Sequence, residues 1–301
     1  MKNMLATSPS PTPPNPAPDR EVRPSLLARY ALLRVLLGAL MVIAAMSVVM
    51  VLAENLPKPA RLLWPQMLAA VLMAAAFRFY ALRIDRRPAT EFASAGAARE
   101  LGLGLLGGAL LVVTVFGALA LLNVFLLQGV HPVGLATLKS IGDMTLVAVF
   151  EELLVRGILF KALERVLGSM PALLASSLLF GLAHLPNDGA TLLSTINVTV
   201  AGILFAAAYL ASGRLWLGIG LHLAWNFCAG HLFSAVVSGH KAEAGLLYGQ
   251  LVGPDWLTGG AFGIEGSVIT LLALLGACAL LLALAGRRGR LLPRPSKQAA
   301  P

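Results

Sequence analysis

Long apolar stretches separated by short polar or basic connections dominate the pattern of hydrophobic and polar positions along this chain. A helix that spans a bilayer needs about 20 apolar residues, and most of these stretches reach that length. We place membrane helices near residues 26–53, 62–84, 101–128, 136–165, 171–185, 191–211, 214–234 and 266–286. The pattern therefore predicts an all-α, polytopic membrane protein with about eight transmembrane helices.

The remaining residues divide the chain into segments. Repeated prolines prevent helix hydrogen bonding in residues 1–25, so we expect a disordered Pro-rich N-terminal tail there.

Within the predicted third helix, Gly104 and Gly108 form a GxxxG pattern that lets a membrane helix pack closely. We expect three helices within 26–130, a core of four helices within 136–234, a Gly-rich outer loop at 235–265, a last helix at 266–286 and a basic cytoplasmic tail at 287–301.

Composition supports the membrane location. Of the 301 residues, 58% are hydrophobic and 12% are charged, with a mean hydropathy of +0.82, and a water-soluble domain could not hide so much apolar surface. The net charge of +9 comes from basic residues beside the apolar stretches, which excludes a separate nucleic-acid-binding domain. Cys228 and Cys278 lie in apolar stretches without ligand-like spacing, so we expect neither a disulfide-linked partner nor a cysteine metal site.

Basic residues also predict the orientation in the membrane. They concentrate in the N-terminal tail, at 83–99, at 161–165, at Arg214 and in the C-terminal tail, and nearly every second connection is poor in them. Lys58 and Arg61 are the exception. The positive-inside rule then places both termini on the cytoplasmic side of the inner (cytoplasmic) cell membrane. The richness in Ala, Leu and Arg is typical of a high-GC bacterium.

Three ionisable residues, Glu151, Glu152 and Arg156, interrupt the fourth apolar stretch. Each charged side chain costs about 2.5–3.5 kcal/mol to insert into a membrane, so their presence indicates that the protein needs them for a function. Glu152 and Arg156 are four residues apart and can neutralise each other on one helix face. Glu151 is rotated by about 100° and needs another partner or a water-lined cavity. Alternatively, all three residues form one ion-pair cluster that only fixes helix packing.

Two more apolar stretches carry polar exceptions. The fifth contains Phe180 and His184, and the seventh contains His222 and Asn226 at a spacing of four. A lone histidine in such a helix is more often a packing residue than a catalytic one. Counted from the inner helix ends, however, Glu151 and these three polar residues all lie about 12–20 Å deep. The sequence therefore predicts a polar site in the core of the bundle.

Such a group of residues suits hydrolysis. A glutamate and a neutral imidazole can activate water, while a second histidine and an asparagine amide can donate hydrogen bonds to an oxyanion. No serine or cysteine has a triad arrangement with these histidines, which disfavours a covalent nucleophile. Alternatively, Glu151, His184 and His222 could bind Zn2+ with Glu152 as base, or Glu151 could be the base while Asn226 helps the histidines. The usual H-E-x-x-H spacing is absent. The sequence leaves both the metal and the metal-free mechanism open.

Together, these three segments resemble the CPBP family of intramembrane proteases, the CAAX-processing and bacteriocin-processing enzymes also called the Abi family. The family pattern is E-E-x-x-x-R, then F-x-x-x-H, then H-x-x-x-N or H-x-x-x-D. The matching residues are, in family order, Glu151, Glu152 and Arg156; Phe180 and His184; and His222 and Asn226. The resemblance covers roughly residues 140–230 and extends to the eight-helix count.

This resemblance implies roles for the motif residues. Glu151 and His184 would activate water, His222 and Asn226 would form the oxyanion site, and Glu152 and Arg156 would support them, as would Phe180 from the same motifs. The family is often labelled as metalloproteases, and a metal-free glutamate mechanism is also argued for it.

The implied function is an intramembrane endopeptidase that cleaves a membrane-associated or lipid-modified protein or peptide. Its expected partners are that substrate and the membrane lipids. Eukaryotic members remove a tripeptide after a prenylated cysteine, whereas many bacterial members have no prenylated substrate. Two alternatives remain: a non-catalytic, peptide-binding immunity or adaptor protein, and an ion or proton carrier that uses the polar residues as a relay.

Overall fold

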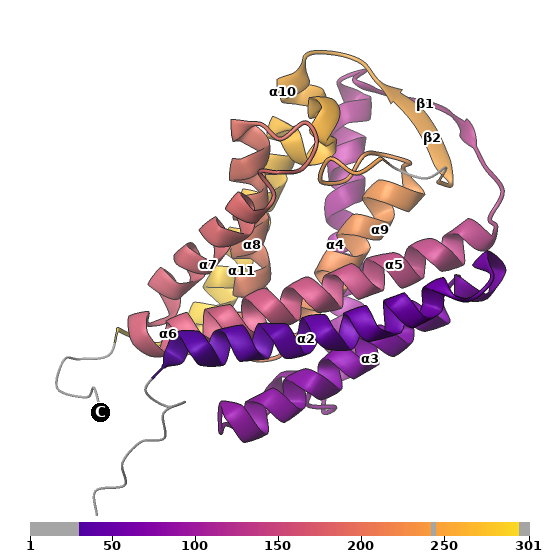
Figure 1. The fold of residues 1–301 in the computed structure, drawn as a ribbon. Coiled ribbons are helices and arrows are strands. Elements are labelled where there is room, and N and C mark those ends of the chain that lie inside the picture. Colours follow the sequence, from indigo (N-terminus) through magenta and orange to yellow (C-terminus); the bar gives the residue numbers. More distant parts are fainter. Residues whose placement is uncertain (1–29, 242–244, 295–301) are drawn as a thin grey trace, which may run out of the picture.

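The computed structural model describes residues 30–241 and 245–294, which form a bundle of helices with one small sheet (Figure 1). The tail predicted at 1–25 lies outside the described residues. So do 26–29, 242–244 of the predicted outer loop, and 295–301 of the predicted basic tail.

The first two described helices pack against each other. Helix α2 spans Ala31–Glu54 and α3 spans Trp64–Phe79, with a short 3-10 turn, η1 (Lys58–Arg61), between them. A π-helical turn, η2 (Tyr80–Ile84), extends α3 to the predicted end at residue 84, and a 3-10 turn, η3 (Thr90–Phe92), precedes the next helix. Both helices lie close to their predicted positions.

The third helix ends earlier than predicted. Helix α4 spans Ala97–Leu121, and strand β1 (Phe125–Val130) follows, so the predicted helix over 101–128 is wrong at its end. The chain turns at Asn123, whose φ of 56° lies in the left-handed region and stops the helix. Strand β1 then pairs antiparallel with β2 (Leu247–Leu251). The apolar run continues through the turn, which is why hydropathy alone extended the helix.

The predicted fourth helix is a chain of three elements. Helix α5 spans Leu135–Glu152, a π-helical segment η4 spans Leu153–Phe160, and α6 spans Lys161–Leu167. The wider turn therefore begins directly after the two glutamates. Such π-helical segments are rare and frequently occur at functional sites.

The remaining helices complete the bundle. Helix α7 spans Ser169–Ala183, α8 spans Leu192–Ser212, α9 spans Trp216–Phe227 with a π-helical extension η5 (Cys228–Leu232), and α11 spans Val268–Arg287. Helix α8 is buried along most of its length because α7 and α11 pack against it. The predicted outer loop contains β2, the short helix α10 (Asp255–Thr258) and two 3-10 turns, η6 (Gly260–Phe262) and η7 (Ile264–Gly266).

Five helical segments in the described part of the chain are long and apolar enough to cross a membrane. They are Ala31–Glu54, Lys58–Ile84, Ala97–Leu121, Leu192–Ser212 and Val268–Arg287. The chain is therefore a multi-pass membrane protein. The count of eight crossings stays a prediction, since the other three predicted spans are shorter or carry charges.

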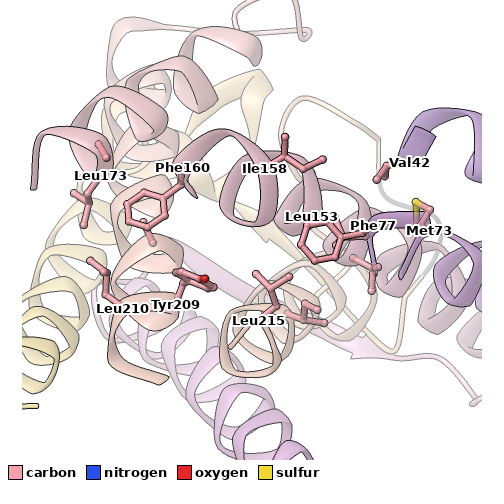
Figure 2. Packing of buried hydrophobic residues seen from close by; sticks show 14 of the residues in the cluster. Val42, Met73, Phe77, Leu153, Ile158, Phe160, Leu173, Tyr209, Leu210 and Leu215 are labelled. Atoms are coloured by element: carbon pink, nitrogen blue, oxygen red, sulfur yellow. The ribbon is translucent and has the colours of Figure 1, made fainter. Parts of the chain in front are cut away.

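An apolar core joins the N-terminal helices to the middle of the chain. Phe77 of α3 and Leu153 of η4 pack in one cluster with Tyr209 of α8 (Figure 2). Within it, the rings of Phe160 and Tyr209 meet edge to face at 5.8 Å. A second cluster, built around Phe116 and Trp225, holds α4, α9 and α11 together. These two cores fix the helices that carry the polar motif residues.

Helices α4 and α9 are in backbone contact. A Cβ atom added at Gly104 would lie 2.4 Å from the carbonyl oxygen of Leu217, and one at Gly108 would lie 2.4 Å from that of Leu221. On α9, Gly220 likewise allows the approach of Leu101. The close packing expected from the GxxxG pattern is confirmed. It sets the position of α9, the helix that carries His222.

An ion-pair cluster surrounds Asp85, just after η2. Its carboxylate lies 2.6 Å from Arg165, 2.7 Å from Arg87 and 3.7 Å from Arg34. Burial alone would raise the pKa of Asp85, but the hydrogen bonds and charges of Arg165 and Arg87 outweigh burial and hold that pKa below its ordinary value. The cluster joins the chain after η2 to α2 and α6.

Candidate active site

A cavity of about 580 Å³ opens between α5, α7, α8, α9 and the segment that follows η5. Its walls are mostly apolar. The four residues predicted to be catalytic, Glu151, His184, His222 and Asn226, all line it. The structure thus brings together, from three different helical regions, the residues that the sequence grouped by depth.

Glu152 and Arg156 lie behind the cavity wall and are both 0% exposed. Arg156 Nη1 donates a hydrogen bond of 2.8 Å to Glu152 Oε1, and Nη2 donates one of 3.0 Å to the carbonyl oxygen of Gly202. The guanidinium group also lies over the rings of Phe180 and Phe205, at 4.7 and 5.1 Å from their centroids. The ion pair expected from the i, i+4 spacing is therefore present.

His222 lies between the two adjacent glutamates. Its Nδ1 atom is 3.3 Å from Glu152 Oε1, and its Nε2 atom is 3.7 Å from Glu151 Oε2. The imidazole ring stacks on Phe205 with centroids 4.5 Å apart and planes 12° apart. The ring orientation is therefore fixed by contacts on its edge and on its face.

The two glutamates have different surroundings. The side chain of Glu151 is 24% exposed and lines the cavity, whereas Glu152 is fully enclosed. Oε2 of Glu152 packs near Gly218, where an added Cβ would come within 3.1 Å of it. Glu151 can therefore meet a molecule in the cavity, and Glu152 cannot.

His184 follows the last residue of α7. Its Nδ1 atom lies 2.8 Å from the backbone oxygen of Phe180. A carbonyl oxygen can only accept, so Nδ1 must carry the proton, and in the neutral ring Nε2 is then an acceptor. The F-x-x-x-H spacing thus has a structural reason, because the fourth residue back supplies the oxygen that fixes the tautomer.

Asn226 lies one helical turn after His222 on α9 and is 7% exposed. The spacing of four places both side chains on the same face of the helix, toward the cavity. Helix α9 can therefore present a ring nitrogen and an amide to one point.

Sequence reasoning missed one buried acid in the wall of this cavity, Glu265 in η7. Its Oε1 atom accepts a hydrogen bond of 2.8 Å from the indole of Trp225, and its Oε2 atom accepts two from Ser238. The range 235–265 was predicted as an outer loop because it is rich in glycine. The sequence offered one signal for the buried role of Glu265: it is an acid directly before an apolar helix.

A second polar group lines the outer part of the cavity. Lys139 and Asp143 of α5 form an ion pair of 2.8 Å, and Gln66 of α3 donates to the same carboxylate at 2.8 Å. Asp143 and Glu151 are eight residues apart and so lie on one face of α5. The polar lining therefore continues along α5 away from Glu151.

A metal site needs donor atoms gathered around one point. Within residues 30–241 and 245–294, no group of three or more His, Cys, Asp or Glu side chains could hold a metal ion. Glu151, His184 and His222 share the cavity, and the Zn2+ set considered from the sequence stays a prediction. Cys228 and Cys278 are both free thiols buried among apolar residues.

A family model matches the part of the chain that carries these residues. Residues 132–228 match the model of a family described as Type II CAAX prenyl endopeptidase Rce1-like. The match covers about a third of the chain, contains every motif residue from Glu151 to Asn226, and ends before Glu265. Neither the curated proteins nor the solved structures contain a match. The family match confirms the resemblance to CAAX proteases.

Proposed function

We propose that this multi-pass membrane protein, which carries an Rce1-like CAAX endopeptidase segment at 132–228, hydrolyses a peptide bond of a membrane-associated or lipid-modified substrate. The observation that supports this most is the position of His222 between Glu151 and Glu152, in a cavity also lined by His184 and Asn226. Placing two carboxylates and two histidines among apolar helices is costly, which favours a role beyond packing.

The first proposed step is activation of a water molecule. Glu151 reaches the cavity and would accept a proton from water there. His184 presents Nε2 as an acceptor because its Nδ1 proton is used by Phe180, so it would orient the same water. The water oxygen would then form a bond to the carbonyl carbon of the substrate.

The second proposed step stabilises the oxyanion that this attack creates. His222 Nε2 and the Asn226 amide would donate hydrogen bonds to it. The ionised Glu152 only accepts, so Nδ1 of His222 must be a donor at 3.3 Å, and donation from Nε2 as well requires the doubly protonated ring.

Collapse of the tetrahedral intermediate completes the reaction. The bond between the carbonyl carbon and the amide nitrogen breaks, and Glu151 returns its proton to the leaving amine. The acid and the amine are then both released, and the enzyme regains its starting protonation. Glu152 and Arg156 touch no substrate in this scheme; they hold His222 in place. Phe180 fixes His184 and covers Arg156.

The cavity lining suggests the substrate class. Its mostly apolar walls suit an apolar peptide or one that carries a lipid. The matched family is described as CAAX prenyl endopeptidases, so peptides that end in a prenylated Cys-a-a-X sequence are the first class to test. We place the protein in the inner membrane of a bacterium with both termini in the cytoplasm, and we assign residues 136–234 as its catalytic core.

Purified full-length protein tests this proposal with internally quenched peptides that end in Cys-a-a-X, with and without an S-farnesyl group. We expect cleavage by the parent and a loss of at least about 1,000-fold in kcat/KM for Glu151→Gln and His222→Ala. Glu54→Gln, at the exposed end of α2, is the matched control. Equal cleavage by the parent and Glu151→Gln would refute the proposal.

A comparison of membrane proteomes from cells that carry the parent or Glu151→Ala would identify a natural substrate. We expect one or more membrane proteins to change in length only when Glu151 is present. A biological function that persists unchanged in the Glu151→Ala strain, with no altered protein, would favour a peptide-binding protein instead.

A further inference from the structure

The segment 234–241, which follows η5, forms the outer wall of the cavity. Ala235, Val237, Ser238, His240 and Lys241 all line it. This wall faces the same space as Glu151 and His222 but belongs to no regular helix or named strand. Within it, the backbones of Val237 and His240 bond to each other across a turn, and contacts from other parts of the chain fix that turn against the bundle.

Glu265 binds this segment through one oxygen atom of its carboxylate and α9 through the other. Oε2 accepts hydrogen bonds from the backbone nitrogen of Ser238 at 2.6 Å and from its hydroxyl at 2.7 Å, while Oε1 accepts from Trp225 at 2.8 Å. All three partners are donors. A carboxylate accepts from all three groups, whereas a glutamine would direct its NH2 group at a donor on one side.

The backbone of the segment is strained where Glu265 binds it. Ser238 has a φ of 50° and Gly239 has a φ of 78°, both in the left-handed region that a non-glycine residue rarely adopts. A Cβ atom at Gly239 would also lie 2.3 Å from the carbonyl oxygen of Asp188. Bonds between the backbones of Val237 and His240 close this turn, and the backbone nitrogen of Gly239 donates to the carbonyl oxygen of Phe262. The two hydrogen bonds to Glu265 add to these contacts at Ser238.

The wall is also tied to two of the three helical regions that carry the proposed catalytic residues. Asn187, three residues after His184, donates a hydrogen bond of 2.9 Å to the carbonyl oxygen of Ser238. Trp225, on the other side of Glu265, directly precedes Asn226. Glu265 thus connects the wall to α9, and Asn187 connects it to the end of α7.

The backbone that carries Glu265 is itself fixed. Asn197 of α8 is 1% exposed and donates hydrogen bonds to the carbonyl oxygens of Glu265 and Ser267 at 2.7 and 2.8 Å. Because α8 is buried along most of its length, the backbone of Glu265 is anchored to a firmly packed element. Movement of the wall therefore requires the bonds between Glu265 and Ser238 to break.

We propose that Glu265 is a positioning residue that holds segment 234–241 as the outer wall of the cavity and thereby controls access and binding of the substrate. The expected effect on cleavage rests on the proposed function. The structural role of Glu265, which is to fix the wall, can be tested without measuring any cleavage.

Cysteine labelling tests the wall directly. Ser140→Cys places a thiol in the cavity lining on α5, and its rate of reaction with maleimides of increasing size reports how open the cavity is. Adding Glu265→Gln should raise the labelling rate at least about tenfold, most for the largest reagent. Parent protein without Ser140→Cys gives the background from Cys228 and Cys278, which are buried.

Two further variants separate positioning from general destabilisation. Glu91→Gln removes another buried acid, one that pairs with Arg87 outside the cavity, so it should lower the melting temperature without changing the labelling rate. Ser238→Ala removes one donor and keeps the backbone bond, so it should raise labelling by a smaller factor. If Glu265→Gln fails to fold, Ser238→Ala carries the test, and unchanged labelling in that variant overturns the proposal.

Kinetics with the farnesylated peptide test the effect on the substrate. Glu265→Gln should raise KM about tenfold, change kcat less than about threefold and leave the pH profile of kcat unaltered, because it touches the wall and not the reacting atoms. A lower active fraction with unchanged KM would mean a merely structural role. If Glu265→Gln labels faster but the parent cleaves no peptide, Glu265 does hold the wall in place and the proposed peptidase function is wrong.

Discussion

The Nδ1 atom of His222 lies 3.3 Å from Oε1 of Glu152, the same oxygen that accepts a hydrogen bond from Arg156. One carboxylate oxygen thus joins α5, η4 and α9 at a point where no water reaches. The role of Glu152 is therefore to fix the side chains of Arg156 and His222. Of the two adjacent glutamates, only Glu151 retains access to the cavity.

Removing Glu152 should destabilise the protein strongly. Glu152→Ala leaves Arg156 charged, buried and without its ion-pair partner, and breaking a buried pair in this way typically costs about 3–5 kcal/mol. We expect a large fall in melting temperature and in the yield of folded protein, measured by thermal unfolding in detergent. Proteolytic activity should fall as well, because His222 loses the contact that fixes its ring.

The neighbouring Glu151→Ala variant is the matched comparison. Its side chain is partly exposed, so we expect a change in stability of no more than about 0.5 kcal/mol and a complete loss of activity. If Glu151→Ala proved as unstable as Glu152→Ala, the assignment of one glutamate to support and the other to chemistry would be wrong.

The contact between α4 and α9 gives a second prediction. Gly108→Leu would force a side chain into the backbone of Leu221 and the Cβ of Ala224, displacing the helix that carries His222. We expect a loss of about 1–3 kcal/mol in stability, as for other overpacked sites, together with reduced activity. Thermal unfolding and peptide cleavage measure the two effects.

Two glycines on the same helix serve as controls. A Cβ atom at Gly102 or Gly117 would meet nothing within 4 Å. The substitutions Gly102→Leu and Gly117→Leu should therefore leave stability and cleavage nearly unchanged. A similar loss at all three positions would point to an effect of glycine on the helix itself, and not to the contact with α9.

The sequence predicted the polar centre better than its surroundings. Residues four apart on a helix lie on the same face, however the helices pack. This holds for Glu152 and Arg156 and for His222 and Asn226, so the structure keeps both pairs together. The pairing of β1 with β2 and the bonds of Glu265 connect residues more than 25 positions apart. No local pattern of hydrophobicity or spacing specifies such partners, and apolar character alone does not distinguish a strand from the end of a membrane helix.

The cluster around Asp85 predicts a pH dependence of stability. Because the pKa of Asp85 is lower in the folded protein than its ordinary value of about 3.9, its contribution is fully present above that value and is lost as the pH falls through the folded-state pKa. Asp85→Asn should therefore be less stable than the parent at pH 7, and the difference should shrink below about pH 4. Melting temperatures of both proteins from pH 7 to pH 3 measure this, and a constant difference would contradict it.

Metal removal gives the last prediction. Because no three donor side chains gather into a ligand set within residues 30–241 and 245–294, we expect cleavage to persist after dialysis against a strong chelator. A metal mechanism requires instead that activity disappear with the metal and return in proportion to added Zn2+. Glu151→Gln, dialysed and supplied with Zn2+ in parallel, shows whether any restored cleavage depends on this carboxylate. If zinc restores the parent alone, then Glu151, His184 and His222 must move together when the ion binds, and the water would be activated by zinc.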